Sequence, residues 1–300
     1  MERLNAAMAP APVRPVKVLQ FGEGNFLRAF VDYMIDIANE KSDFNGSVAL
    51  VKPIQMGTLF PAFKEQDYRY TVMLRGLVDG QAVEQTRVVT SVADAVDAYA
   101  DYARYADYAK LPSLRFIVSN TTEAGIVLDE TDEFSLCPPK SYPGKLTKFL
   151  EAFDYAQDKG LIILPVELID DNGIMLKKCV KALAKQWALG EKFEQWLETA
   201  CVFTSTLVDR IVTGYPRGED QAIWAIRTTC WTPLNPSVCG SSNPPATFPT
   251  NCPCRSAGCP SSTLIIRSLT SSARCESSTA RTRPSSLLPS SAAMTSCWTR

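Results

Sequence analysis

The fold of this chain is decided by one stretch, Val16-Lys17-Val18-Leu19-Gln20-Phe21-Gly22-Glu23-Gly24-Asn25-Phe26-Leu27-Arg28-Ala29-Phe30. Its first six residues are mostly apolar and predict a strand, which Gly22 and Gly24 end. Apolar residues then recur at helical spacing and predict a helix from Asn25 to about Lys41: they are Phe26, Phe30, Met34 and Ile37. A strand, a glycine turn and a helix N-terminus form the usual cradle for a pyrophosphate, because backbone N–H groups can approach the phosphates.

The glycine turn falls short of a complete dinucleotide fingerprint. That fingerprint is Gly-x-Gly-x-x-Gly, and Leu27 stands here in place of its third glycine. An ordinary strand-to-helix turn fits two glycines about as well. Arg28, one turn into the predicted helix, could hold a phosphate or could be solvated. The choice between a coenzyme site and an ordinary turn therefore depends on the rest of the chain.

The composition is that of a soluble globular protein. The chain has 300 residues, 46% of them apolar, and a net charge of −1, which suits one large or two ordinary domains. No apolar run is long enough to span a bilayer, so we expect no membrane partner. Residues 1–15 lack the apolar core of a secretory signal and predict a loose leader, and a cytoplasmic location follows by default.

The composition changes sharply near residue 226. Residues 227–300 contain seven of the ten cysteines and no lysine, and seven arginines stand there against the single acid Glu276. Their net charge is +6, so residues 1–226 carry −7. Such different compositions rarely belong to one packed unit. We therefore predict a folded dinucleotide-binding domain over 16–226 and a low-complexity, disordered tail over 227–300.

Strands and helices alternate after the first helix. Strands are predicted at 47–51, 114–119 and 161–166, helices at 91–110, 143–159, 173–189 and 191–200, and a hairpin from 69–77 and 81–89 around Asp79-Gly80. Alternation with short connections predicts an α/β fold with a Rossmann-type, mostly parallel sheet covered by helices.

A stripe of tyrosines lies in the predicted helix 91–110. The four residues recur every third position: they are Tyr99, Tyr102, Tyr105 and Tyr108. Ala and Asp surround them rather than Lys and Arg, which favours a packed helix face over a nucleic-acid partner.

The second predicted strand lacks the acid that usually binds the ribose hydroxyls of NAD at the strand's end. Lys52-Pro53-Ile54-Gln55 stands there instead. Lys52 could favour the 2′-phosphate of NADP, or it could be an exposed lysine of no consequence. The residues at the end of this strand therefore do not decide between NAD and NADP.

Small polar residues follow the later strands. Asn120 to Gly125 come directly after one of them, where open α/β sheets bind ligands, although Thr121 or Thr122 could instead cap a turn. Asp209 and Arg210 end a further apolar run, either as a structural ion pair or as part of a site wall.

Four separated stretches occur in a consistent order. They are Phe21-Gly22-Glu23-Gly24-Asn25-Phe26-Leu27-Arg28, Ser119-Asn120-Thr121-Thr122-Glu123-Ala124-Gly125, Pro165-Val166-Glu167-Leu168-Ile169-Asp170-Asp171-Asn172-Gly173 and Val208-Asp209-Arg210-Ile211-Val212. Together they resemble the long-chain polyol dehydrogenase (mannitol dehydrogenase) family, which includes the hexuronate reductases. The resemblance covers about residues 16–226. It implies a Rossmann-type N-terminal domain, a largely helical C-terminal domain, and hydride transfer between NAD(H) and a linear hexuronate or polyol.

The resemblance also implies which residues form the site. The coenzyme-binding residues are Gly22, Gly24, Asn25, Phe26, Leu27 and Arg28 at the pyrophosphate turn, with Thr122 and Glu123 near the nicotinamide. Asn172, Asp209 and Arg210 are the candidates for the site wall. The implied cofactor is NAD, with NADP not excluded, the implied partner is a small sugar acid or polyol, and no metal is implied.

The family's proton-transfer group is missing from this sequence. The resemblance implies a Lys-x-x-x-x-Asn-x-x-His motif, in which the lysine moves the proton while Asn and His polarise the substrate oxygen. This chain has no histidine, and its last lysine is Lys192. We therefore expect no catalytic residue, a helical C-terminal domain that is missing or replaced by the tail, and negligible turnover. The alternative function is that of a non-catalytic NAD-binding or regulatory protein.

The tail is compatible with translation in a shifted reading frame. If Arg274 has an AGR codon, the codons of Arg274 to Thr282 read one nucleotide earlier permit Lys-Val-Arg-Ile-Leu-Asn-Gly-Ala-His, the missing motif at its proper spacing. We place the slip near 224–229. The competing interpretations are a natural disordered extension and a cysteine-rich metal module, but Cys252, Cys254 and Cys259 lack the spacing of a zinc site.

Overall fold

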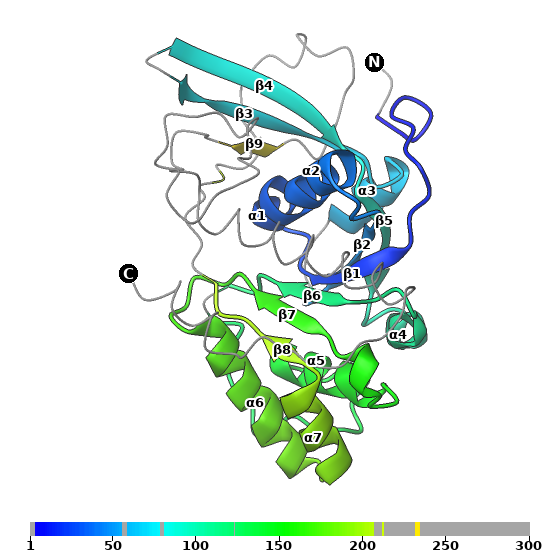
Figure 1. Ribbon diagram of the computed structural model, residues 1–300, viewed down its shortest axis with the longest axis vertical. Helices are drawn as coiled ribbons and strands as arrows, with labels where there is room; N and C mark the ends of the chain where they lie inside the picture. The colour runs from blue at the N-terminus through cyan, green and yellow to red at the C-terminus, as the bar shows by residue number, and fades with distance from the viewer. Residues whose placement is uncertain are drawn as a thin grey trace, which may run out of the picture.

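The computed structural model describes residues 4–55, 59–78, 81–122, 124–206, 212 and 232–234. Its centre is a six-stranded sheet with helices on both faces (Figure 1). The strands are β1 (Val16–Phe21), β2 (Ser47–Lys52), β5 (Val92–Asp97), β6 (Phe116–Ser119), β7 (Ile162–Pro165) and β8 (Val202–Phe203). They lie in the order β5-β2-β1-β6-β7-β8, and every neighbouring pair is parallel. This is the Rossmann strand order, so the predicted fold class is confirmed.

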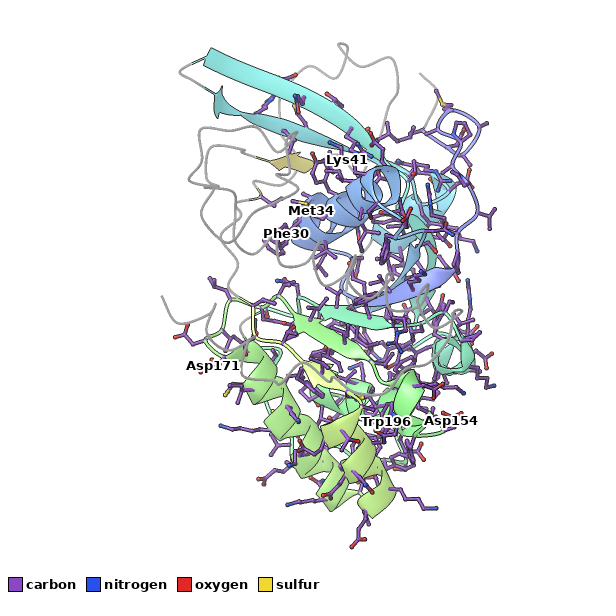
Figure 2. All side chains as sticks on the ribbon, viewed as in Figure 1. Phe30, Met34, Lys41, Asp154, Asp171 and Trp196 are labelled. Atoms are coloured by element: carbon purple, nitrogen blue, oxygen red, sulfur yellow. The ribbon has the colours of Figure 1, made fainter. Side chains whose placement is uncertain are left out.

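The helix after β1 covers one face of the sheet. It begins at Asn25 and ends at Lys41 as predicted, in three successive parts: α1 (Asn25–Leu27), the π-helical η1 (Arg28–Asp32) and α2 (Tyr33–Lys41). Phe30 and Met34, labelled in Figure 2, are buried in the same cluster as Val18 and Val48 of the sheet. The π-helical part was not predicted, because apolar spacing does not report a single wide turn.

The opposite face of the sheet is covered by α4 (Tyr102–Asp107), α5 (Tyr142–Glu151), α6 (Asn172–Gln186) and α7 (Glu191–Thr199). Leu19 and Phe21 of β1 pack on this side, while Val18 packs on the other, so β1 is buried on both faces as a central parallel strand should be. Trp196 of α7 is buried, and its indole N–H donates to the carbonyl oxygen of Ala156 at 3.0 Å (Figure 2).

A β-hairpin arm extends from the end of the molecule opposite α6 and α7 (Figure 1). It follows α3 (Leu59–Glu65) and consists of β3 (Tyr70–Val78) and β4 (Gln81–Val89), which pair antiparallel as predicted. The predicted turn residues Asp79 and Gly80 lie outside the residues that the structure describes.

The arm has a third strand, β9 (Thr232–Leu234), which pairs parallel with β3 through Val72 and Leu74. These three residues are the part of 227–300 that the structure describes, so the predicted disorder of that tail lies outside the described residues. At the other end of the chain, Leu4 is buried and the N–H of Ala6 donates to Asp67 Oδ2 at 3.0 Å, which attaches the segment before β1 to the arm's base.

The predicted helix over 91–110 is wrong in its first half. Val92–Asp97 is the strand β5, because Val92 and Val96 are β-branched and the segment pairs along β2. The helix α4 begins only after Asp101, whose carboxylate accepts from the N–H of Arg104 at 3.0 Å. The 3₁₀ turn η2 (Tyr108–Lys110) ends it, and a second one, η3 (Gln157–Lys159), follows α5, which ends earlier than predicted.

No helix in the part of the chain that the structure describes has the length and apolar character needed to cross a bilayer. Among the same residues, no group of three or more cysteine, aspartate and glutamate side chains is arranged to hold a metal ion.

Candidate coenzyme site

The site is built at the carboxyl end of β1, where the strand order of the sheet reverses between β1 and β6. Gly22 has φ +125° there, and its N–H donates to the carbonyl oxygen of Val51 at 3.0 Å. A Cβ on Gly22 would lie 2.9 Å from Leu27 Cδ1 and 3.1 Å from the carbonyl oxygen of Asn120. Only glycine fits this position, because both the backbone conformation and the space exclude a side chain.

Gly24 differs from Gly22 in its surroundings. It is the residue before α1, and a Cβ added to it would meet no atom within 4 Å. Open space therefore lies in front of the first turn of the helix, and Gly24 has no side chain with which to cap that turn. The arrangement leaves room for an anion to approach the helix N-terminus.

The residues that follow Gly24 point mostly into the protein. Leu27 packs beneath Gly22, and the ring of Phe26 packs against that of Phe30 with 5.5 Å between centroids. Arg28 is only 1% exposed, so the interpretation of a solvated Arg28 is wrong. Its guanidinium bonds to the side-chain oxygen of Asn25 and lies 5.2 Å and 5.7 Å from two ring centroids of the arm's base, those of Phe63 and Tyr70.

A buried carboxyl group lies behind the turn. Asp32 is fully buried, and its Oδ2 lies 3.0 Å from the Tyr70 hydroxyl and 3.4 Å from the side-chain nitrogen of Gln20. Among the residues that the structure describes, Asp32 Oδ1 and Gln20 Oε1 have no hydrogen-bond partner. Burial raises the pKa of Asp32 to about 7, against the hydrogen bonds from Tyr70 and Gln20.

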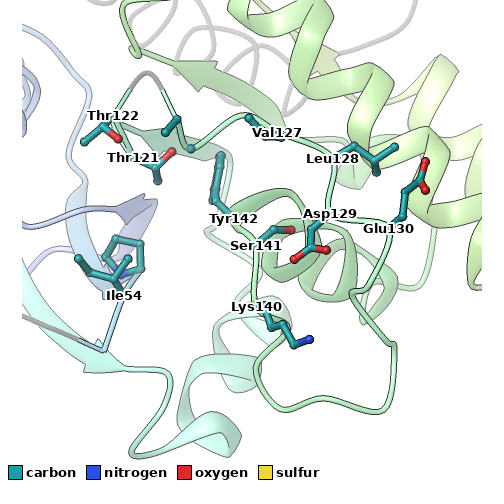
Figure 3. A pocket seen from close by; sticks show the side chains of 13 residues that line it. Ile54, Thr121, Thr122, Val127, Leu128, Asp129, Glu130, Lys140, Ser141 and Tyr142 are labelled. Atoms are coloured by element: carbon teal, nitrogen blue, oxygen red, sulfur yellow. The ribbon is translucent and has the colours of Figure 1, made fainter.

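A cavity of about 680 Å³ opens between the segments that follow β2 and β6 and the start of α5 (Figure 3). It is lined by Pro53, Ile54, Thr121, Thr122, Ala124, Gly125, Val127, Leu128, Asp129, Glu130, Lys140, Ser141 and Tyr142. Thr122 lies there in the left-handed conformation with φ +71°. The Tyr142 hydroxyl is buried without a hydrogen-bond partner among the described residues, and burial raises its pKa well above the usual value.

Glu167 fixes the loop that lines this cavity. It follows β7, is 1% exposed, and accepts from the Thr121 N–H and hydroxyl at 3.0 Å each and from the Ser119 hydroxyl at 3.1 Å. Burial raises its pKa. Sequence reasoning missed Glu167, although an acid directly after a buried strand was a usable signal. The alternative of a capped turn is right about the turn, since the Gly125 N–H donates to the Thr122 carbonyl oxygen at 3.0 Å. The Thr121 hydroxyl donates to Glu167, and the next helix among the described residues begins at Tyr142 and is capped by Ser141.

Asn172, a candidate for the site wall, is buried inside the protein and is not among the residues that line the cavity. Its side chain is fully buried, and Nδ2 lies 3.1 Å from the Pro165 carbonyl oxygen and 3.0 Å from that of Glu167. The N–H of Thr206 donates to Oδ1 at 2.9 Å. Asn172 therefore joins the end of β7, the start of α6 and the segment after β8. The remaining candidates, Glu123, Asp209 and Arg210, lie outside the described residues.

We expect Asn172→Ala to lower the free energy of unfolding by about 2–3 kcal/mol, because several buried backbone groups lose their partner at once. Asn120→Ala is the matched control at the same edge, since within the described part of the chain the Asn120 amide donates only to Val166 O, at 2.7 Å. It should cost about 1 kcal/mol. Urea denaturation followed by circular dichroism measures both, and equal losses in the two variants would contradict this role of Asn172.

Sequence comparison identifies the family to which this architecture belongs. The family described as Mannitol dehydrogenase Rossmann domain matches residues 16–230. The chain belongs to this family. The resemblance to the mannitol dehydrogenase family that the four sequence stretches carry is thereby confirmed, over nearly the same range as predicted.

Curated proteins similar to this chain include altronate oxidoreductases. That of Yersinia enterocolitica is 47% identical to this chain over 231 residues, which are 75% of this chain and 47% of the relative. An altronate oxidoreductase of Escherichia coli O7:K1 is 49% identical over 225 residues, 73% of this chain and 46% of the relative. The chain thus spans about half the length of the curated relatives that it matches.

Two solved structures share the fold of this chain. Pseudomonas fluorescens mannitol 2-dehydrogenase, in a ternary complex with NAD and D-mannitol, aligns with a TM-score of 0.65 at 20% identity, over 78% of this chain and 53% of that one. A substrate-free D-sorbitol dehydrogenase aligns with a TM-score of 0.59 at 19% identity, over the same shares of the two chains. At this identity the likeness concerns the fold.

Proposed function

We propose that this chain binds NAD(H) at the Gly22–Gly24 turn. It is then the coenzyme-binding part of an oxidoreductase that transfers a hydride between the nicotinamide and a linear hexuronate or polyol. The observation that carries the proposal is the contrast between the two glycines: Gly22 has no room for a side chain, and Gly24 faces open space before a helix N-terminus. This turn stands at the strand-order reversal, where Rossmann sheets bind dinucleotides.

The residues present fit such a coenzyme. Gly24 and Asn25 would hold the pyrophosphate with backbone N–H groups, and Gly22, whose own N–H donates to Val51, would let the backbone approach it. The cavity beside Ile54 would take the adenosine. Thr122, with Glu123 beside it in sequence, would lie toward the nicotinamide. Bound NAD(H) supplies the hydride chemistry, and the protein's part is to orient the coenzyme and exclude water from it.

Tagaturonate, reduced to altronate, is the substrate we propose. The support is the similarity to altronate oxidoreductases, at 47–49% identity over about three quarters of this chain. Both coenzyme and sugar acid are dissolved metabolites, which suits a cytoplasmic enzyme.

This 300-residue chain by itself should show negligible turnover, because it has no histidine and no lysine after Lys192 to move the proton. The match to the family ends at residue 230, next to the proposed frame slip near 224–229, and supports that boundary. A tagaturonate reduction assay tests this part of the proposal, and normal turnover by the chain would contradict it.

Calorimetric titration of the full chain with NADH tests the coenzyme site. Gly24→Val should weaken NADH binding by about tenfold or more, because the new side chain fills the space meant for the pyrophosphate. The melting temperature should fall by only about a few degrees, since a Cβ at this position meets no protein atom within 4 Å. Unchanged NADH affinity in a folded Gly24→Val protein would exclude this turn as the binding site.

A further inference from the structure

Two opposite charges meet where the ribose of a bound dinucleotide is recognised in Rossmann folds. Lys52 ends β2 and Asp97 ends β5, and the two residues are partners in the strand register. Lys52 Nζ lies 3.0 Å from Asp97 Oδ2, with the two side chains only 9% and 25% exposed. The interpretation of Lys52 as an exposed lysine of no consequence is therefore wrong. Its charge is balanced by a carboxylate from the neighbouring strand.

Asp97 is held in place independently of the lysine. Its Oδ1 accepts from the N–H of Tyr99 at 3.0 Å. The Tyr99 hydroxyl in turn donates to the carbonyl oxygen of Pro53 at 3.4 Å, and Pro53 lines the cavity. The end of β5 is thus tied to the segment after β2, on the rim of the proposed adenosine pocket.

A third charged group belongs to the same cluster. Glu23 stands between the two glycines of the turn and is 8% exposed. Lys52, Arg28 and Asp97 all act on it electrostatically, which places its carboxylate within the field of the Lys52–Asp97 pair. The cluster therefore holds the two carboxylates Glu23 and Asp97 and the two cations Lys52 and Arg28, of which Arg28 is only 1% exposed. Among the residues that the structure describes, the cavity lining holds two further acidic residues, Asp129 and Glu130, and one basic residue, Lys140.

We propose that Asp97, brought from β5 to the end of β2, replaces the acid that the sequence lacks there and makes the site select NAD(H) over NADP(H). A carboxylate can accept hydrogen bonds from ribose hydroxyls, whereas a 2′-phosphate would be repelled by the Asp97 carboxylate and would meet a lysine that is already paired. The inference rests on the proposed coenzyme function and adds the residue that sets its specificity.

Calorimetric titrations of the full chain with NADH and with NADPH test the inference. The wild type should bind NADH at least about tenfold more tightly than NADPH. Asp97→Asn keeps the acceptor for the Tyr99 N–H but frees Lys52, so the NADH preference should fall by about tenfold or more. Lys52→Met should act in the opposite direction, weakening NADPH binding further while NADH binding is retained. Asp107→Asn on α4, where the carboxylate is 62% exposed, changes the net charge equally and should leave the preference unchanged.

Asp97→Asn and Lys52→Met are expected to change the NADH preference in opposite directions, so either variant alone can contradict the inference. An unchanged preference in Asp97→Asn that still binds NADH would overturn the inference and leave the proposed function standing. If Asp97→Asn does not fold, as judged by circular dichroism, Lys52→Met decides alone, and equal or tighter NADPH binding in it would overturn the inference. Absence of binding of either nucleotide to the wild type would refute the proposed function itself.

Discussion

Replacing Gly22 by valine is expected to lower the free energy of unfolding by about 3–5 kcal/mol and to abolish NADH binding. Valine is strained at φ +125°, and its Cβ would lie 2.9 Å from Leu27 Cδ1 and 3.1 Å from a backbone oxygen of Asn120. Relief of these contacts must separate β1 from β6 or displace the helix after β1. Urea denaturation followed by tryptophan fluorescence measures the loss.

Gly24→Val is the matched control two residues away. It introduces the same side chain at a position where a Cβ meets nothing within 4 Å, so it should cost about 1 kcal/mol or less, the difference between glycine and valine before a helix. Both variants should therefore bind NADH more weakly, but only Gly22→Val should strongly lower the free energy of unfolding. A Gly22→Val protein as stable as the wild type would show that this tight turn does not hold the strands together.

Asp32→Asn is expected to stabilise the protein at pH 8 by up to about 4 kcal/mol, and by little at pH 4. Burial raises the pKa of Asp32 from 3.8 to about 7, so the folded protein keeps a proton that the unfolded chain releases between these values. Stability from this group is therefore present below about pH 4 and is lost as the pH rises toward 7. Asparagine carries no charge at any pH and removes that loss.

The difference between variant and wild type isolates Asp32, because the raised pKa values of Glu23 and Glu167 act equally in both proteins. Urea denaturation between pH 4 and pH 8 should give a difference that grows by up to about 1.4 kcal/mol per pH unit. A difference that is constant with pH would mean that Asp32 is not protonated in the folded state.

The sequence was sufficient for those parts of the fold that depend on short-range pattern. The strand, glycine turn and helix of 16–41 are local, so apolar spacing and two glycines predicted them. The strand β5 was missed because alanine and aspartate in Val92–Asp97 also suit a helix, and because the tyrosine spacing that follows extended the helical pattern backward. Pairing with β2, which decided the matter, is a long-range contact that no local pattern reports.

The site was predicted less completely, for the same physical reason. Gly22 and Gly24 act through their backbone and are visible in the sequence. The surroundings of Arg28 depend on Phe63 and Tyr70 at the base of the arm, and the partner of Lys52 comes from a strand 45 residues later. Glu167 shows its importance only once β7 lies beside β6 and its carboxylate meets Thr121.

The helix after β1 is joined to the arm and to the segment after it by more than apolar packing. Arg87 of β4 donates to Asp36 at 2.6 Å and to Glu40 at 2.8 Å, and the hydroxyl of Ser91 donates to the carbonyl oxygen of Asp32 at 2.8 Å. The hairpin and the helix that starts at the glycine turn should therefore move together as one rigid unit. A force applied to the outer strand would be transmitted along this helix to its first N–H groups, at the point where the pyrophosphate is proposed to sit.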